Sequence, residues 1–374
     1  MRLIRTSALS AVALTGALAL SACGSDNNSG NAGAGSGAGA GATSGSTSAA
    51  GACFTGTLKG EGSSAQKNAI ESAIKSFQGS CADATVNYNA SGSGAGVKQF
   101  LAGQVDFAGS DSALSADEAT TAAQKCGSPA WNIPMVTGPV GVAYNLPGVD
   151  KLVLNADVTA SIFTGKIKKW NDPAIAALNA GATLPDKAIT VFFRSDDSGT
   201  TDNFQNYLKA AAAGAWGLAS GKKWLGPVGE GKPQNAGVGS ATKAQEGSIS
   251  YLEWSYIQQN KLGLAQIDTG SGPITLTAET VGTSVSSAKQ VGTGNDLSLK
   301  LDYATKQAGA YPIILVTYEI VCSKYSDAKK AESVRAFLKS FASTSTQKSI
   351  QEIGYAPLPT DIAAKVNTAI SAIG

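Results

Sequence analysis

The sequence predicts an α/β protein built from two folding units. From Phe54 onward, short runs rich in β-branched and aromatic residues alternate with helical patterns. The length of 374 residues suits two units at about 150 residues each. Apolar residues make up 43% of the chain and charged residues 15%, which is enough for a sizeable core.

The N-terminus has the pattern of a secretory signal peptide over residues 1–22. Arg2 and Arg5 precede a short, alanine-rich apolar run, and small residues follow it. The run is too short for a good membrane-spanning helix. The Leu-Ser-Ala-Cys sequence ending at Cys23 resembles a bacterial lipobox, in which the cysteine is acylated and becomes the new N-terminus. An ordinary signal peptide followed by a chance cysteine is the alternative.

Residues 23–52 are predicted to be the lipidated Cys23 followed by a flexible tether. Nearly every residue after Cys23 is Gly, Ala, Ser, Thr or Asn, a composition that buries nothing and behaves as a flexible coil. We therefore expect a globular body that is anchored by lipid to the cell membrane and faces away from the cytoplasm.

Strands and helices are predicted to alternate through the rest of the chain. The expected strands are Phe54–Lys59, Thr85–Asn89, Val105–Ala108, Trp131–Thr137, Val140–Asn145, Ile189–Arg194, Ser248–Leu252 and Ile313–Val321. The expected helices are Ala65–Phe77, Ser115–Lys125, Thr201–Ala211, Asp327–Phe341 and Asp361–Ile373. Ser115 and Glu118 form a capping box at the start of the second helix.

Four cysteines remain beside the lipidated one, an even number that suits an oxidising compartment. Cys53 and Cys81 each precede a predicted strand and can meet at one sheet edge. Cys126 precedes the fourth predicted strand and Cys322 ends the last, so these two face each other if the strands are antiparallel neighbours. Three pairings are possible. A four-cysteine metal site is the rival, although no Cys-x-x-Cys occurs, and we expect no metal.

The chain contains no histidine, which excludes Ser-His-Asp and Cys-His catalysis and imidazole-ligated zinc. Its formal charge is +2, which gives no electrostatic footprint for nucleic acid. Loss of the signal peptide removes two arginines, so 27 basic residues then balance 27 acidic ones. We expect no cofactor, no nucleic-acid partner and no enzymatic activity.

Four polar loops rich in Gly, Ser and Thr follow predicted strands, at residues 60–64, 91–96, 109–112 and 194–200. Ligands of α/β sheets bind beyond the carboxyl ends of strands. Helix N-termini there offer free N–H groups and partial positive charge, which suit an oxyanion. One such loop alone is more often a cap or turn, but four loops, one with an arginine, indicate a site for a small anion.

Motifs for other chemistries are incomplete. Gly92-x-Gly94 lacks the third glycine of the dinucleotide fingerprint, and no Gly-Lys-Ser/Thr completes a P-loop. Ser-x-x-Lys pairs recur so often that they reflect composition, and Lys-Thr-Gly is missing. A secreted Ser/Lys hydrolase and a lipid-anchored adhesin are the alternatives of other classes.

Several segments together resemble one known family. The matching segments are residues 91–99 (SGSGAGVKQ), 105–111 (VDFAGSD), 194–200 (RSDDSGT), 144–148, 163–173 and 355–359. They resemble the PstS family, the substrate-binding proteins of the phosphate-specific ABC transporter. The resemblance runs in order from about Leu58 to the C-terminus, which is far more specific than any single match.

The resemblance implies a two-lobed periplasmic-binding-protein fold of type II with phosphate held in a cleft between the lobes. It implies that the chain crosses the hinge twice, near Gly138 and near Pro312. Lobe I is then residues 54–137 plus 313–374, and lobe II is residues 138–312. The implied function is high-affinity phosphate binding and delivery to the membrane permease and ATPase subunits of a phosphate ABC transporter.

By motif position, the resemblance also implies the phosphate ligands. They are Ser64, the Ala65 backbone N–H, Ser93 and Asp111 from lobe I, and Arg194, Ser198, Gly199 and Thr200 from lobe II. Asp196 is implied to hold Arg194. Ser64 and Ala65 stand where the family usually has threonine and an aromatic residue. Asp197 replaces the usual glycine, and a carboxylate there is unfavourable for an anion unless it points outward.

Asp111 gives this predicted site a means of selecting its anion. Phosphate near neutral pH still carries a proton, which an ionised Asp111 accepts in a hydrogen bond. Sulfate and molybdate present no such proton and would face an unpaired carboxylate, a penalty of several kcal/mol. A receptor for one of those oxyanions is therefore the less favoured alternative within the same fold.

Overall fold

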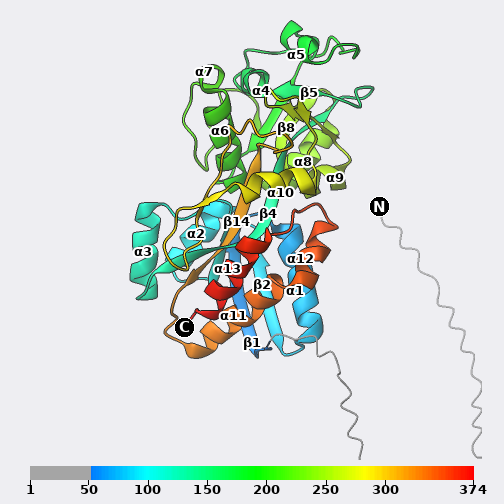
Figure 1. The fold of residues 1–374 in the computed structure, drawn as a ribbon. Coiled ribbons are helices and arrows are strands. Elements are labelled where there is room, and N and C mark those ends of the chain that lie inside the picture. The colour runs from blue at the N-terminus through cyan, green and yellow to red at the C-terminus, as the bar shows by residue number, and fades with distance from the viewer. Residues whose placement is uncertain (1–51) are drawn as a thin grey trace, which may run out of the picture. The chain divides into compact units, whose positions relative to one another are not determined.

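The computed structural model describes residues 52–374 (Figure 1). The predicted signal peptide, Cys23 and nearly all of the tether lie outside the described residues. Strands and helices alternate along the described chain, and most strands join one mixed sheet. Within the described range, no helix combines the length and hydrophobicity needed to span a membrane.

The first lobe is built on five strands in the order β2-β1-β3-β14-β4. The strands are β1 (Gly56–Gly62), β2 (Ala84–Asn89), β3 (Phe107–Ser110), β4 (Ala130–Asn145) and β14 (Ile314–Cys322). β1 is parallel to β2 and β3, whereas β14 is antiparallel to β3 and β4. Gly62 lies opposite Gly109, so the carboxyl ends of β1 and β3 meet at one edge of the sheet.

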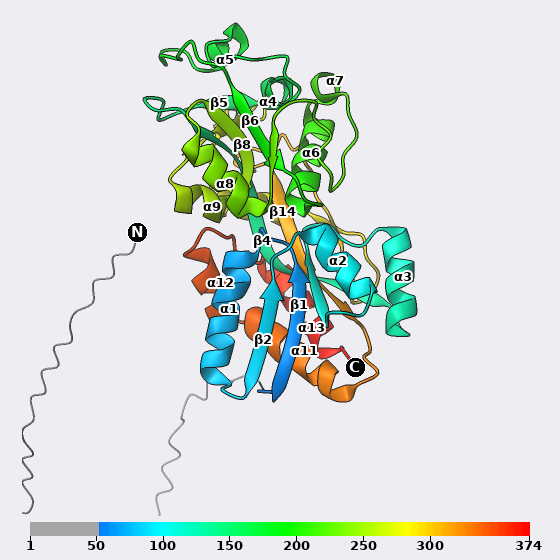
Figure 2. The ribbon, with the colours of Figure 1, turned by 180° about the vertical axis from the view of Figure 1, so that it is seen from behind.

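Helices pack on both faces of these strands, as Figure 2 shows from behind. They are α1 (Lys67–Ser80), α2 (Ser93–Leu101), α3 (Ala116–Cys126), α11 (Ala328–Phe341), α12 (Thr344–Gln351) and α13 (Thr360–Ser371). Successive β14 side chains point to opposite faces. Leu315 belongs to the cluster that contains Phe337 of α11, whereas Val316 belongs to the one that contains Phe100 of α2.

The second lobe continues the sheet from β4 in the order β4-β8-β6-β7, and β9 also pairs with β4. These strands are β6 (Thr190–Arg194), β7 (Glu230–Lys232), β8 (Ser248–Glu253) and β9 (Gly263–Leu264). The helices are α4 (Ala156–Phe163), α5 (Pro173–Leu178), α6 (Gly199–Ala211), α7 (Ala213–Trp216), α8 (Gln234–Ala244), α9 (Trp254–Asn260) and α10 (Ala278–Ser286). Two small sheets comprise β5 (Val153–Asn155), β10 (Gln266–Asp268) and β11 (Pro273–Ile274), and β12 (Lys289–Gln290) and β13 (Leu299–Lys300).

β4 links the two lobes as a single strand of 16 residues, where the sequence predicted two strands separated at Gly138 and Pro139. The strand pairs with β14 as far as Pro139 and with β8 from Val140 onward. A proline has no N–H to donate, so it is tolerated where the strand changes partner. The predicted two-lobed α/β fold is confirmed, with β4 and β14 as its connecting strands (Figure 1).

Local sequence signals predicted the start of α3 correctly and the start of α2 incorrectly. The capping box at Ser115 and Glu118 is present at the start of α3. The expected loop 91–96, in contrast, is wrong in its second half, because Ser93 already begins α2. Gly92 caps this helix with a φ of 111°, a backbone conformation that favours glycine. Glycine has low helix propensity, so the first turn looked like a loop.

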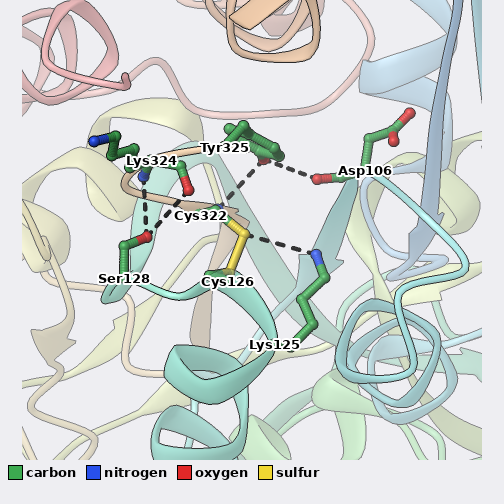
Figure 3. The surroundings of a disulfide bond; sticks show 7 residues. All are labelled: Asp106, Lys125, Cys126, Ser128, Cys322, Lys324 and Tyr325. Atoms are coloured by element: carbon green, nitrogen blue, oxygen red, sulfur yellow. Dashed lines mark hydrogen bonds between the residues drawn. A yellow bond between two sulfur atoms is a disulfide. The ribbon is translucent and has the colours of Figure 1, made fainter. Parts of the chain in front are cut away.

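Two disulfides join cysteines of the first lobe. Cys53 is bonded to Cys81, and Cys126 to Cys322. These are the two pairs that the strand positions favoured, and they leave none of the four cysteines available to a metal. The second bond joins the end of α3 to the end of β14 (Figure 3).

Candidate functional site

The predicted site residues converge where the two lobes face each other. The predicted side chains are all buried, namely Ser64, Ser93, Asp111, Arg194, Ser198 and Thr200. Asn235 Nδ2 donates to Ser64 Oγ at 3.2 Å and lies 3.4 Å from Thr200 Oγ1, which links the lobes. A Cβ atom on Gly199 would lie 2.5 Å from Asp111 Cβ, so only glycine allows this approach. Residues far apart in sequence therefore form one cluster.

Arg194 ends β6 and is held rigidly at the site. Its Nε donates to Asp196 Oδ1 at 2.9 Å, its Nη2 donates to Asp196 Oδ2, and its Nη1 donates to Thr200 Oγ1 at 3.2 Å. Burial alone would raise the pKa of Asp196, but the hydrogen bonds and charge of Arg194 lower it. Asp196 therefore stays ionised and fixes the plane of the Arg194 guanidinium group.

Asp111 follows β3 and is 3% exposed. Its Oδ1 accepts a hydrogen bond from Thr317 Oγ1 at 2.8 Å, and its backbone N–H donates to Ser93 Oγ at 3.2 Å. Burial raises the pKa of Asp111, while hydrogen bonds with Ser63 and Thr317 and the charge of Arg194 oppose that rise. The site thus combines a buried carboxylate with a buried arginine.

The start of α6 supplies donors from the second lobe. Ser198 caps the helix, since its Oγ accepts the Thr201 N–H at 3.1 Å. Gly199 and Thr200 form the first turn, where backbone N–H groups lack intrahelical acceptors and the helix dipole favours an anion. Ser198 is therefore a helix cap, and it lies where the sequence predicted part of an anion site.

The loop after β1 is more engaged with the protein than the sequence suggested. The Ala65 N–H, expected to face a ligand, donates to Ser63 Oγ at 3.0 Å. Ser64 Oγ accepts from both the backbone and side-chain nitrogens of Asn235, each at 3.2 Å. Hydrogen bonds thus hold this loop both within its own turn and against the second lobe.

Further contacts between the lobes surround the site. The Gly94 N–H donates to the Asp197 carbonyl at 2.9 Å, and Asn68 Nδ2 donates to Ser255 Oγ at 2.7 Å. The Asp197 carboxylate forms an ion pair with Lys98 at 2.8 Å. Asp197 therefore points outward, toward a cation of the other lobe, and the lobes are closed over the cluster.

Three polar residues of the cluster were missed by the sequence reasoning. Thr317 donates a hydrogen bond to Asp111, Ser63 lies near enough to Asp111 to lower its pKa, and Asn235 bridges the lobes. Ser63 lay within a predicted loop and could have been named with Ser64. Thr317 lies on a strand and Asn235 near the start of α8, so only the three-dimensional fold brings them to the site.

Comparisons with known proteins give the class and then the family. Residues 36–345 match the PBP superfamily domain, which spans most of the chain. The phosphate-binding protein PstS 3 of Mycobacterium leprae is 48% identical over 389 residues, covering 100% of both chains. PstS 2 of Mycobacterium tuberculosis is 45% identical over 382 residues, again with 100% coverage of both. The chain belongs to the PstS family of phosphate-binding proteins.

Solved structures agree on the fold. The high-affinity periplasmic phosphate-binding protein PfluDING, bound with phosphate, has a TM-score of 0.68 at 22% identity, covering 85% of this chain and 99% of its own. The phosphate-binding protein of Stenotrophomonas maltophilia has a TM-score of 0.67 at 20% identity, covering 84% and 94%. At sequence identities this low, the similarity to these structures shows the fold alone.

Proposed function

We propose that this protein binds inorganic phosphate outside the cytoplasm and delivers it to the permease and ATPase subunits of a phosphate ABC transporter. The relatives at 45–48% identity are named phosphate-binding proteins. The observation that carries the proposal is the burial of Asp111 and Arg194 in one cluster between the lobes, close enough for the charge of Arg194 to act on Asp111. Such a site holds and releases an anion, and we infer no enzymatic role for it.

The proposed ligands divide the oxygens of phosphate between the lobes. Arg194, oriented by Asp196, donates from one side together with the hydroxyls and first-turn N–H groups of α6. The proposed second-lobe ligands are Arg194, Ser198, Gly199 and Thr200. The proposed first-lobe ligands are Ser64, Ser93, Asp111 and, once released from Ser63, the Ala65 N–H. Hydroxyls add donors without net charge, so a protein of balanced charge still binds the anion.

Asp111 supplies the selectivity in this proposal. Thr317 occupies Oδ1 with a donated proton, and burial keeps water from the carboxylate. The remaining oxygen accepts the O–H of phosphate, whereas sulfate and molybdate offer no such donor and leave a buried charge unpaired.

Opening and closing of the lobes loads and unloads the site. We propose that lobe I is residues 54–137 plus 313–374 and that lobe II is residues 138–312, with the hinge where β4 exchanges β14 for β8. A permease that recognises the closed form would distinguish the loaded receptor from the empty one. Once the signal peptide over residues 1–22 is removed, the acylated Cys23 and the tether would hold this receptor at the outer face of the membrane.

Calorimetry tests the proposed ligand directly. The purified protein, stripped of phosphate, is expected to bind phosphate with micromolar or tighter affinity, about −8 kcal/mol or better. Sulfate is expected to bind at least about 100-fold more weakly, because an unpaired buried carboxylate costs several kcal/mol. Equal affinity for the two ions would contradict the role given to Asp111, and no phosphate binding would contradict the function.

Replacing Asp197 tests how strongly the outward ion pair supports closure. Asp197→Asn is expected to weaken phosphate binding by no more than about threefold, since an exposed pair contributes about 0–1 kcal/mol and Lys98 is 73% exposed. The loss should shrink as salt concentration rises. Lys98→Gln is the matched control and should give the same loss. Tighter phosphate binding by Asp197→Asn would show instead that the carboxylate repels the ligand.

A further inference from the structure

A second buried carboxyl group, Glu319, lies beneath the candidate site. It shares a face of β14 with Thr317, because the two are separated by one residue in a strand. Its side chain is fully buried, and neither carboxyl oxygen has a hydrogen-bond partner. Gln66 lies within hydrogen-bonding reach of Glu319, and its buried amide oxygen is also without a partner. The Glu319 carboxyl oxygens and the Gln66 amide oxygen are thus neighbouring buried acceptors without a donor.

The hydrogen bonds around Gln66 fix which way its amide points. The Ser63 carbonyl can only accept, so the Tyr88 hydroxyl donates its proton to it, at 3.0 Å. Tyr88 can then only accept from Gln66 at 3.0 Å, which requires the amide nitrogen on that side. The buried amide oxygen is left without a donor, and an ionised Glu319 could not supply one.

Gly109 makes this arrangement possible. A Cβ atom there would lie 2.1 Å from Gln66 Nε2 and 2.3 Å from the Tyr88 hydroxyl, so the amide packs directly on the β3 backbone. Glu319 is the cross-strand partner of Gly109 on β14. The sheet register therefore places the carboxyl group next to the packed amide.

We propose that Glu319 is a positioning residue that holds a proton in the folded protein and donates it to the Gln66 amide oxygen. The resulting chain runs from Glu319 through Gln66 and Tyr88 to the backbone of the loop that carries Ser63. It gives a partner to the Gln66 amide oxygen and to one Glu319 oxygen, and it keeps a second negative charge away from Asp111. The consequence for ligand binding rests on the phosphate-binding function proposed above.

The groups that face Glu319 agree with a neutral carboxyl. Burial raises the pKa of Glu319 to about 8, and the negative charge of Asp111 contributes to that rise. Its register partners Gly109 on β3 and Ile133 on β4 do not titrate. Tyr88 of β2 has a pKa well above its ordinary value, chiefly through burial, and stays neutral. Asp111 is thus the charge that ionised Glu319 would meet.

Phosphate binding and the Glu319 proton are therefore coupled. Ionised Glu319 would add a second negative charge beneath an anion site and would remove the donor that orients Gln66. Phosphate affinity should fall once the pH passes about 8, by at most about tenfold for each pH unit, the limit for one coupled proton.

The experiment compares the pH dependence of phosphate affinity in the wild type and in Glu319→Gln. The amide introduced by this substitution is neutral at every pH and can donate an N–H to Gln66. From pH 7 to pH 9.5 the wild type is expected to lose at least about fivefold more affinity than the variant. Titration of phosphate itself affects both proteins equally and cancels. Glu71→Gln, which removes an exposed carboxylate from α1, is the matched control and should follow the wild type.

Identical pH profiles for the wild type and Glu319→Gln would overturn the proposal. An infrared difference spectrum at pH 7 provides a second readout that does not require ligand. The wild type should show a protonated carboxyl band that Glu319→Gln lacks, and its absence would equally overturn the proposal. If neither protein binds phosphate, the function proposed above fails, while the infrared result still decides the protonation of Glu319.

Discussion

Replacing Arg194 by alanine is expected to weaken phosphate binding by about 100- to 1,000-fold or more. The Arg194 side chain is buried, lies against Asp196, and brings positive charge to a site that also contains Asp111. Without it, two buried or half-buried carboxylates would face the anion. Removing one partner of a buried charge pair costs roughly 3–5 kcal/mol, and about 1.4 kcal/mol changes affinity tenfold. Titration calorimetry with phosphate measures this loss.

Two variants separate the geometry of Arg194 from its charge. Arg194→Lys keeps the charge but cannot make the two parallel hydrogen bonds to Asp196, so it should recover only part of the affinity. Lys98→Ala removes a cation that is 73% exposed and should weaken binding by no more than about threefold. Thermal unfolding without ligand checks that each variant is folded. A folded Arg194→Ala protein with wild-type affinity would place the site elsewhere.

Local signals in the sequence predicted the polar loops of the candidate site, whereas the individual ligands within those loops were implied by the resemblance. Ser198 reads as a helix cap and Arg194 as the end of a strand from a few neighbouring residues, and the structure has both features. The buried carboxylate at Asp111 follows a short strand whose apolar residues are equally visible in the sequence. The two-lobed fold followed from the resemblance, since alternating strands and helices alone indicate only the α/β class.

The supporting contacts could not be predicted, because they join distant segments. Thr317 is 206 residues from Asp111, and Asn235 is 171 residues from Ser64. Glu319 lies in a strand that is buried throughout, where a carboxyl group is unexpected. Only the sheet register, which places Glu319 opposite Gly109, shows which groups surround it.

The continuity of β4 was missed for a related reason. Gly138 and Pro139 are ordinary turn residues, and only the change of partner from β14 to β8 shows why a strand tolerates them. Local sequence therefore predicted a break between two strands at Gly138 and Pro139, where the structure has one continuous strand that changes its partner.

Removing the Cys126–Cys322 disulfide is expected to lower the free energy of unfolding by about 5 kcal/mol. A cross-link restricts the unfolded chain more as the loop that it closes grows longer, and this loop spans 196 residues. The loop includes the whole second lobe, so the bond restrains most of the chain. Urea unfolding of Cys126→Ala/Cys322→Ala, followed by circular dichroism without phosphate, measures the change. Alanine is chosen because Cys322 is buried and a serine hydroxyl would need a partner.

The Cys53–Cys81 pair is the matched control, because its loop spans only 28 residues. Its double alanine variant should lose about 3.5 kcal/mol on the same argument. A smaller loss from the long loop than from the short one would show that native contacts around Cys322 dominate. The Tyr325 hydroxyl is such a contact, since it accepts the Cys322 N–H at 3.3 Å and donates to the Asp106 carbonyl at 2.8 Å (Figure 3). Those bonds hold the end of β14 whether or not the sulfurs are joined, and Tyr325→Phe would then become the more destabilising change.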